Sequence, residues 1–368
     1  MKIGILTFHR AENFGAVFQA YALQTFLGEL GHEAYIIDYR CPAIEASYHI
    51  FNPSILWSRR NVFLSLKQYV ERFGHIQHRI EKKKKYDSFR KIFLKQTSPV
   101  SSITQDMGFD AYIVGSDQVW NLHLTHGIDD VYFLNFPHRA NSKLISYAAS
   151  SENDPNGLIC KNKEKVGNLL ARFSSISVRE DFLKDILTDL YATSLGKIEV
   201  SLDPTFLLSR SSYLKLVPER LISQKYILVY HMTPVEEGVR LAEKMALGKE
   251  MVVIEAFGGF TKKCDRKRYK QDLGPLELLN YIAYAESVIT TSFHGVALSL
   301  ILQKDFWVVN KGDNLRQRSI LKRLNLQNRM ISTAEEFNPE SIDYVDVSSK
   351  LNELIGKSKS YLVNSLEK

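Results

Sequence analysis

Candidate chemical groups lie where a predicted strand rich in β-branched residues, 287–291, is followed by a helical pattern. The residues at this junction are Ser292, Phe293, His294 and Gly295. Hydroxyls and an imidazole at a helix N-terminus suit a bound phosphate, because the positive end of the helix attracts anions. His294 is also the side chain best placed to exchange protons near neutral pH. We predict that His294 contacts a ligand or takes part in catalysis; the alternative is a structural histidine.

A second candidate site follows the predicted strand 111–115. Side chains suited to binding a sugar lie close together in the sequence there: Ser116, Asp117, Gln118, Trp120 and Asn121. Amides bond hydroxyls, and an aromatic ring stacks on a sugar face. The alternative is a cap or turn that only starts a helix. We favour the sugar-binding interpretation.

Two further strand ends carry weaker signals. Asn13 and Gly15 follow the first predicted strand, where a glycine lets a ligand approach backbone N–H groups, although simple turn chemistry explains them too. Arg179 follows the predicted strand 174–178, where a guanidinium can clamp a phosphate or carboxylate. An ordinary salt bridge to Glu180 explains Arg179 equally well.

These positions depend on strands and helices that alternate along the chain. Strand, turn, helix and strand within the first 40 residues predict a βαβ unit with a right-handed crossover and a parallel sheet. The alternation recurs in two blocks, with predicted strands at 2–8, 33–39, 111–115, 143–149, 174–178 and 197–202, then at 226–230, 251–256, 287–291 and 306–309. The predicted fold class is α/β, with Rossmann-like domains at 1–205 and 206–345 and a closing helix at 346–368. Ligands of such sheets bind at the carboxyl ends of the strands, which makes the strand-end residues informative.

Basic charge is concentrated in one segment. The chain of 368 residues has a net charge of +7, but residues 51–95 hold twelve Lys and Arg against three acidic residues. The rest of the chain is therefore close to −2. Apolar residues at helical spacing predict an amphipathic basic helical insert. One interpretation is a solvated helix face; the other is peripheral contact with anionic lipid headgroups or a diphosphate-linked acceptor.

Several function classes are excluded by motifs that the sequence lacks. Its three cysteines are far apart and form no CxxC pair, which argues against a disulfide scaffold or zinc ribbon. No apolar run reaches about 18 residues and no signal-peptide pattern is present, so we expect a cytoplasmic protein. HExxH, GxSxG, Walker and GxGxxG motifs are absent, and we therefore predict no metal centre and no dinucleotide cofactor. No nucleic-acid motif occurs, so nucleic acid is not expected as a partner.

The strand-end segments resemble the polysaccharide pyruvyl transferase family, in family order, at residues 13–23, 109–121, 145–150, 176–180, 202–205 and 290–295. The resemblance implies two Rossmann-like domains of the glycosyltransferase-B type facing a cleft, with the acceptor on the first and the donor on the second. It also implies transfer of pyruvate from phosphoenolpyruvate to a sugar, as a ketal across two hydroxyls, with no cofactor. Family acceptors are bacterial capsular, exopolysaccharide or cell-wall glycan precursors. They are often carried on undecaprenyl diphosphate, which implies a reaction at the inner face of the plasma membrane.

The resemblance assigns donor binding to Arg179 and His294. Many members have an Arg where this chain has Ser292, so the charge that binds phosphoenolpyruvate must come from elsewhere. Arg179 is the first candidate, and Arg316 and Arg318 come next.

The reaction expected from the resemblance begins when an acid protonates C3 of phosphoenolpyruvate, and His294 is the candidate acid or phosphate partner. A sugar hydroxyl then attacks C2, and a second hydroxyl displaces phosphate. Asp117 or Glu180 is the candidate base for the acceptor. Two rival hypotheses stay open: a nucleotide-sugar glycosyltransferase of the same architecture, and a non-catalytic glycan-binding subunit.

Overall fold

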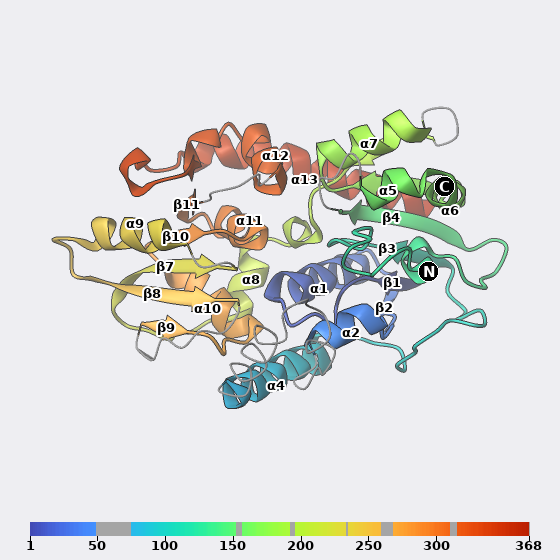
Figure 1. Cartoon of the computed structure of the whole chain (residues 1–368), viewed down its shortest axis with the longest axis horizontal. Coiled ribbons are helices and arrows are strands. Elements are labelled where there is room, and N and C mark those ends of the chain that lie inside the picture. Colours follow the sequence, from blue (N-terminus) through green and yellow to red (C-terminus); the bar gives the residue numbers. More distant parts are fainter. Residues whose placement is uncertain are drawn as a thin grey trace, which may run out of the picture.

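The computed structural model describes residues 1–48, 75–151, 157–191, 196–232, 235–258, 268–309 and 315–367. Within these ranges the chain forms two six-stranded parallel sheets, each with helices packed against it (Figure 1). The predicted fold class, α/β with two Rossmann-like sheets, is confirmed. The domain boundaries at residues 205 and 345 stay a prediction.

The first sheet has the strand order β2-β1-β3-β4-β5-β6. Its strands are β1 (Lys2–Leu6), β2 (Glu33–Ile36), β3 (Ala111–Val114), β4 (Lys143–Ala149), β5 (Ser175–Val178) and β6 (Ile198–Val200). Its helices are α1 (Phe14–Glu29), α2 (Pro42–Tyr48), α5 (Leu158–Lys161), α6 (Lys163–Leu170) and α7 (Asp181–Tyr191). Strands β2 and β3 flank β1 on opposite sides, so the strand order reverses at β1. In folds of this kind the crevice at such a reversal is where ligands bind.

The second sheet has the order β12-β11-β10-β7-β8-β9 and reverses beside β7. Its strands are β7 (Lys225–His231), β8 (Met251–Phe257), β9 (Tyr269–Lys270), β10 (Ser287–Thr290), β11 (Asp305–Val309) and β12 (Met330–Ile331). Its helices are α8 (Arg210–Leu216), α9 (Glu236–Ala246), α10 (Pro275–Tyr284), α11 (Phe293–Ile301) and α12 (Leu315–Arg323). The short turn η3 (Pro204–Leu207) lies between β6 and α8.

Strand β7 shows why these segments are apolar on both sides. Ile227 and Val229 pack with Leu241 of α9, whereas Leu228 and Tyr230 point into the larger core on the opposite face. Successive strand residues alternate between faces, and both faces are covered by helices, so a continuous apolar run is required. The larger core continues from β1 of the first sheet to β11 of the second, and the two halves therefore share one apolar interior.

The last helix, α13 (Tyr344–Glu367), reaches back from the second half to the first (Figure 1). The Tyr361 hydroxyl donates to the Ser146 carbonyl at 2.9 Å, and the backbone N–H of Leu202 donates to the Ser358 hydroxyl at 2.9 Å. The helix expected near the C-terminus is present and begins slightly earlier than the sequence indicated.

Helix α4 (Ile76–Phe93), the described part of the basic insert, lies beneath both halves (Figure 1). On one side the ring of Phe89 packs 5.2 Å from Phe18 of α1. On the other side Lys82 donates to the Gly258 carbonyl at 2.9 Å, and Lys85 pairs with Glu277 at 2.8 Å. These two lysines therefore connect α4 to the second half and do not form a free basic surface.

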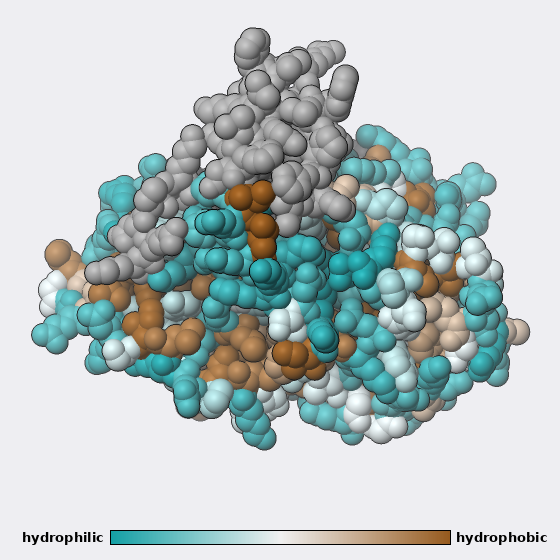
Figure 2. Space-filling view, turned by 90° about the horizontal axis from the view of Figure 1, so that it is seen from below, coloured by the Kyte–Doolittle hydropathy of each residue, from teal (hydrophilic) through white to brown (hydrophobic). Residues whose placement is uncertain are grey.

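No described helix combines the length and apolar character needed to cross a membrane. On the face seen in Figure 2, hydrophilic and hydrophobic residues are interspersed. Much of the predicted amphipathic helix pair, residues 49–74, lies outside the described residues. For that segment, membrane contact stays a prediction.

Truncation of the buried Phe89 side chain tests whether α4 is part of the structural core. Truncation to Ala should lower the free energy of unfolding by about 3 kcal/mol, because a buried aromatic side chain is removed and a cavity remains. The same truncation at Ile92, which is 69% exposed on the same helix, should change it by less than about 0.5 kcal/mol. Urea unfolding followed by circular dichroism measures both, and equal small effects would contradict this role of α4.

Candidate functional site

The carboxyl ends of the strands at the two reversal points come together. The loop after β1 meets the start of α11, which follows β10, and the loops after β3, β5 and β6 border the same place. The strand-end residues of both sheets therefore form one candidate site between the two halves.

A pair of ionisable side chains crosses between the halves at this site. The Asp203 carboxylate lies 3.4 Å from Nε2 of His294, close enough for an ion pair but longer than a good hydrogen bond. Its other oxygen accepts from the backbone N–H and hydroxyl of Thr205, which fixes its orientation. Burial alone would raise the pKa of Asp203, but His294 and Arg179 outweigh burial and hold that pKa well below its ordinary value. Asp203 is therefore a fixed negative charge beside the imidazole.

The His294 ring is enclosed by the start of α1. A Cβ added at Gly15 would overlap the imidazole, so only glycine leaves room for the ring. The ring meets Phe14 and Phe293 edge-on, at centroid distances of 6.3 and 5.2 Å. The structure thus corrects the prediction that Gly15 admits a ligand, because that space is filled by His294. Asn13 caps α1, because its side chain accepts a hydrogen bond from the Gly15 N–H at 2.9 Å. This is the turn role that the sequence offered as the alternative to ligand binding.

Arg179 is held by the protein itself on three sides. Its Nε donates to Glu180 at 2.6 Å, Nη1 donates to Asp203 at 2.8 Å and Nη2 donates to Ser150 at 2.9 Å. The guanidinium also lies 4.4 Å from the ring centre of Phe293. Burial would lower the pKa of Arg179, but Glu180 and Asp203 raise it above its usual value. One N–H on each terminal nitrogen has no acceptor among the described residues, and the side chain is only 2% exposed.

Arg316 and Arg318 differ sharply although both lie on α12. Arg316 is partly buried and faces Arg179, Glu180 and Asp117, yet it makes no hydrogen bond or ion pair with any described residue. Burial and the nearby Arg179 lower the pKa of Arg316. Arg318 is exposed, so the structure places it away from the predicted donor site.

The residues after β3 divide between the site and the core. The Ser116 hydroxyl donates to the Ala148 carbonyl at 2.8 Å and lies 3.2 Å from Asp203. The Asp117 carbonyl accepts from the Ser150 N–H at 3.0 Å, and φ of Asp117 is +67°. These two residues border the site.

The structure corrects the prediction that the Trp120 ring stacks on a sugar. The side chain is 1% exposed, stacks on Phe133 at 5.7 Å and donates from Nε1 to the Tyr132 carbonyl. No face of the ring is open to a sugar. Asn121 is also buried, and its amide donates to the side chain of Gln118 at 2.6 Å.

Ser292 stands at the start of α11 as a cap. Its hydroxyl accepts from the Gly295 N–H at 3.4 Å, and its own N–H donates to the Thr290 hydroxyl at 3.0 Å. The residue therefore stabilises the turn that presents His294 and brings no charge. Asp203, which sequence reasoning did not assign to the site, joins both halves; its signals were an Asp directly before a Pro at a strand end and its place in the family-like segment 202–205.

One group of side chains has the composition of a metal site. Ligand atoms of His78, Glu81 and Asp272 lie within 4.8 Å of one another. His78 already bonds Asp272 at 2.9 Å, and Lys85 donates to the Asp272 carbonyl. These contacts join α4 to the second half, which accounts for the group without an ion.

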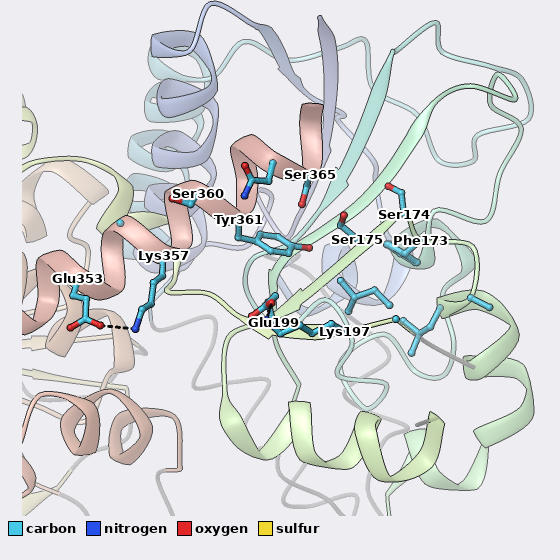
Figure 3. Close-up of a pocket in the computed structure, with 16 residues that line it drawn as sticks. Phe173, Ser174, Ser175, Lys197, Glu199, Glu353, Lys357, Ser360, Tyr361 and Ser365 are labelled. Atoms are coloured by element: carbon cyan, nitrogen blue, oxygen red, sulfur yellow. Dashed lines mark hydrogen bonds and ion pairs between the residues drawn. The ribbon is translucent and has the colours of Figure 1, made fainter. Parts of the chain in front are cut away.

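A hollow of about 920 Å³ lies between α13 and the first residues of β5 and β6 (Figure 3). Tyr361 points from α13 toward β5, and Glu353 pairs with Lys357 along the helix. Arg179 follows the opposite, carboxyl end of β5. Because ligands of parallel sheets bind at carboxyl ends, the hollow is separate from the candidate site.

The close approach of Gly15 and His294 gives a matched pair of variants on one helix. Gly15→Ala should lower the free energy of unfolding by about 1–3 kcal/mol, because the new methyl group must displace the imidazole. Gly28→Ala meets no atom within 4 Å and should raise it by about 0.5 kcal/mol, since Ala loses less backbone entropy than Gly. Thermal unfolding measures both, and shifts of the same sign would count against the proposed packing.

Comparison with solved structures gives distant likenesses. They include the UDP-GlcNAc 2-epimerase from Methanocaldococcus jannaschii (12% identity, 97% of this chain and 92% of that chain, TM-score 0.46). Another is a putative UDP-N-acetylglucosamine 2-epimerase from Listeria monocytogenes (10% identity, 96% of this chain and 90% of that chain, TM-score 0.49). A third is the E. coli heptosyltransferase WaaC with ADP-2-deoxy-2-fluoro heptose (12% identity, 85% of this chain and 91% of that chain, TM-score 0.38). Likeness at this level says nothing about activity.

Comparison with curated proteins gives no significant match. A family model, described as polysaccharide pyruvyl transferase, matches residues 13–312. That span covers most of the chain and includes Arg179, Asp203 and His294. The chain therefore belongs to the polysaccharide pyruvyl transferase family.

Proposed function

We propose that this chain transfers pyruvate from phosphoenolpyruvate to two hydroxyls of a sugar, forming a ketal. The observation that carries the proposal is the joining of Asp203, Arg179 and His294 between the two halves, with Arg316, which has no partner among the described residues, near Arg179. An acid and a cation at one point are what protonation of an enol phosphate requires.

The donor's phosphate and carboxylate require positive charge once they leave water. Arg316 is the natural ligand, because its guanidinium has no partner among the described residues. Arg179 adds the N–H groups on its two terminal nitrogens that Asp203 and Ser150 leave open. Arg316 thus supplies the charge that an Arg at position 292 supplies in many family members.

Before the reaction His294 is protonated, and the negative charge of Asp203 stabilises its imidazolium. His294 then transfers this proton to C3 of the donor. C2 then has oxocarbenium character, and one acceptor hydroxyl attacks it while losing its proton to a carboxylate. Asp117 is the better base of the two candidates, because Glu180 is buried behind Arg179. The second hydroxyl attacks C2, the bond to the phosphate oxygen breaks, and phosphate leaves with the remaining proton.

The acceptor we propose is a capsular, exopolysaccharide or cell-wall glycan precursor carried on a lipid diphosphate. Family membership supports the glycan. Four cations that precede α4 in the sequence, Arg59, Arg60, Lys67 and Arg72, support a diphosphate-linked carrier and a location at the inner face of the plasma membrane; the paired lysines of α4 do not.

Donor binding is tested with neighbouring arginines on α12. Calorimetry with phosphoenolpyruvate should show saturable binding to the wild type and binding at least about tenfold weaker to Arg316→Ala, because a charge-assisted bond is lost. The exposed Arg318→Ala is the matched control and should bind like the wild type. Arg179→Ala is a poor probe, since it leaves Glu180 and Asp203 buried without compensation. Binding of a UDP-sugar but not of phosphoenolpyruvate would instead favour a glycosyltransferase.

Proton donation is tested by His294→Asn. Phosphate release from phosphoenolpyruvate, with methyl β-D-galactopyranoside, methyl β-D-glucopyranoside or methyl α-D-mannopyranoside as acceptor, should fall about 10²- to 10⁴-fold. The thermal unfolding midpoint should fall by only a few degrees, because Arg179 and Thr205 still donate hydrogen bonds to Asp203. The exposed His123→Asn should release phosphate normally. Near-normal turnover in His294→Asn would exclude this histidine as the acid.

A further inference from the structure

The Glu12 carboxylate lies near the site and has no partner among the described residues. Glu12 lies in the loop between β1 and α1, is partly buried, and forms no hydrogen bond or ion pair with any described residue. Burial raises the pKa of Glu12, and four cations oppose that rise: Lys82, Lys83, Arg79 and Arg90. A partly buried carboxylate without a partner is uncommon in a folded protein and indicates a group that a ligand satisfies.

A small hollow opens beside this carboxylate. Its volume is about 20 Å³, and its lining includes Glu12, Lys82, Tyr86, Tyr230, Phe257 and Gly258. That space accommodates one group of the size of a water molecule or a hydroxyl, and no sugar ring. Lys82 is only 5% exposed and donates to the Gly258 carbonyl; burial lowers its pKa to about 8, and the charge of Glu12 opposes that fall.

The hollow adjoins the Asp203–His294 pair. Phe14 also lines it, with its ring 5.0 Å from Tyr230 and 6.3 Å from His294. The Tyr48 hydroxyl lies within electrostatic reach of both Asp117 and Glu12 and makes no hydrogen bond with a described residue. Glu12 and Tyr48, which form no hydrogen bond in the described part of the chain, thus lie between the hollow and the base proposed for the acceptor.

Arg316 and Glu12, neither of which has a partner among the described residues, suit different kinds of ligand. Arg316 suits an anionic donor, whereas the Glu12 carboxylate, whose charge the nearby cations offset, accepts hydrogen bonds from hydroxyls. We propose that Glu12 binds hydroxyls of the acceptor sugar, and that one hydroxyl or hydroxymethyl group enters the hollow beside Lys82. The proposal rests on the proposed function. It identifies the part of the site that recognises the neutral, hydroxyl-rich ring of the acceptor.

The test compares Glu12→Gln with the wild type. Saturation-transfer NMR with the three methyl glycosides named above, in the presence of phosphoenolpyruvate, gives the dissociation constant of each sugar. We expect at least one sugar to bind the wild type and to bind Glu12→Gln about tenfold more weakly, because bonds to a charged acceptor become bonds to a neutral one. The control Glu29→Gln, at the exposed far end of α1, should bind as the wild type does. Calorimetry should show unchanged phosphoenolpyruvate binding in both variants.

Two outcomes would overturn the inference: equal sugar affinity in Glu12→Gln and the wild type, or no binding of any of the three sugars to the wild type. Phosphoenolpyruvate binding separates this failure from failure of the proposed function. If the wild type binds the donor while Glu12→Gln leaves sugar affinity intact, only the role of Glu12 is wrong. If the wild type binds no donor even with sugar present, the pyruvyl transfer itself is wrong.

Discussion

The negative charge of Asp203, fully enclosed by protein, is the constraint on which the site depends. An ion out of water is tolerated only when other charges and hydrogen bonds compensate it. Here Arg179 compensates it from the first half and His294 approaches it from the second. The requirement to neutralise one carboxylate therefore also sets how the two halves face each other. Gly15 follows from the same requirement, because the imidazole reaches Asp203 only where α1 lacks a side chain.

The sequence predicted the parallel sheets and the positions of Arg179 and His294, because strand alternation is a local pattern and the carboxyl ends of parallel strands share one edge. It failed where partners are distant in the chain. Asp203 reads locally as a residue that ends a strand, and its role appears only beside His294. Trp120 follows a turn at a strand end, which is where a ring that stacks on a ligand is expected. A ring that packs in the core occurs in the same local sequence pattern, so the sequence could not separate the two. Arg316 and Arg318 are indistinguishable by composition; the helix turns one inward and the other outward.

The basic segment shows the limit of reading function from net charge. In α4, burial of Lys82 and pairing of Lys85 with Glu277 place cations at the junction of the two halves. Lys83 and Arg90 share Asp87. Among the four consecutive lysines of this helix, only Lys84 is exposed. Much of the charge that looks like a surface for a polyanion thus holds the protein together.

Helix α13 has a consequence for the synthesis of the chain. Its last turns supply Leu362, which is fully buried, and the Ser358 and Tyr361 contacts that complete the first sheet. Chains generally fold domain by domain from the N-terminus as they leave the ribosome. Here the first sheet lacks part of its own covering until α13 emerges. Part of the apolar surface of the N-terminal half therefore stays exposed while the second half is made, and loss of α13 would damage the part of the protein that is translated first.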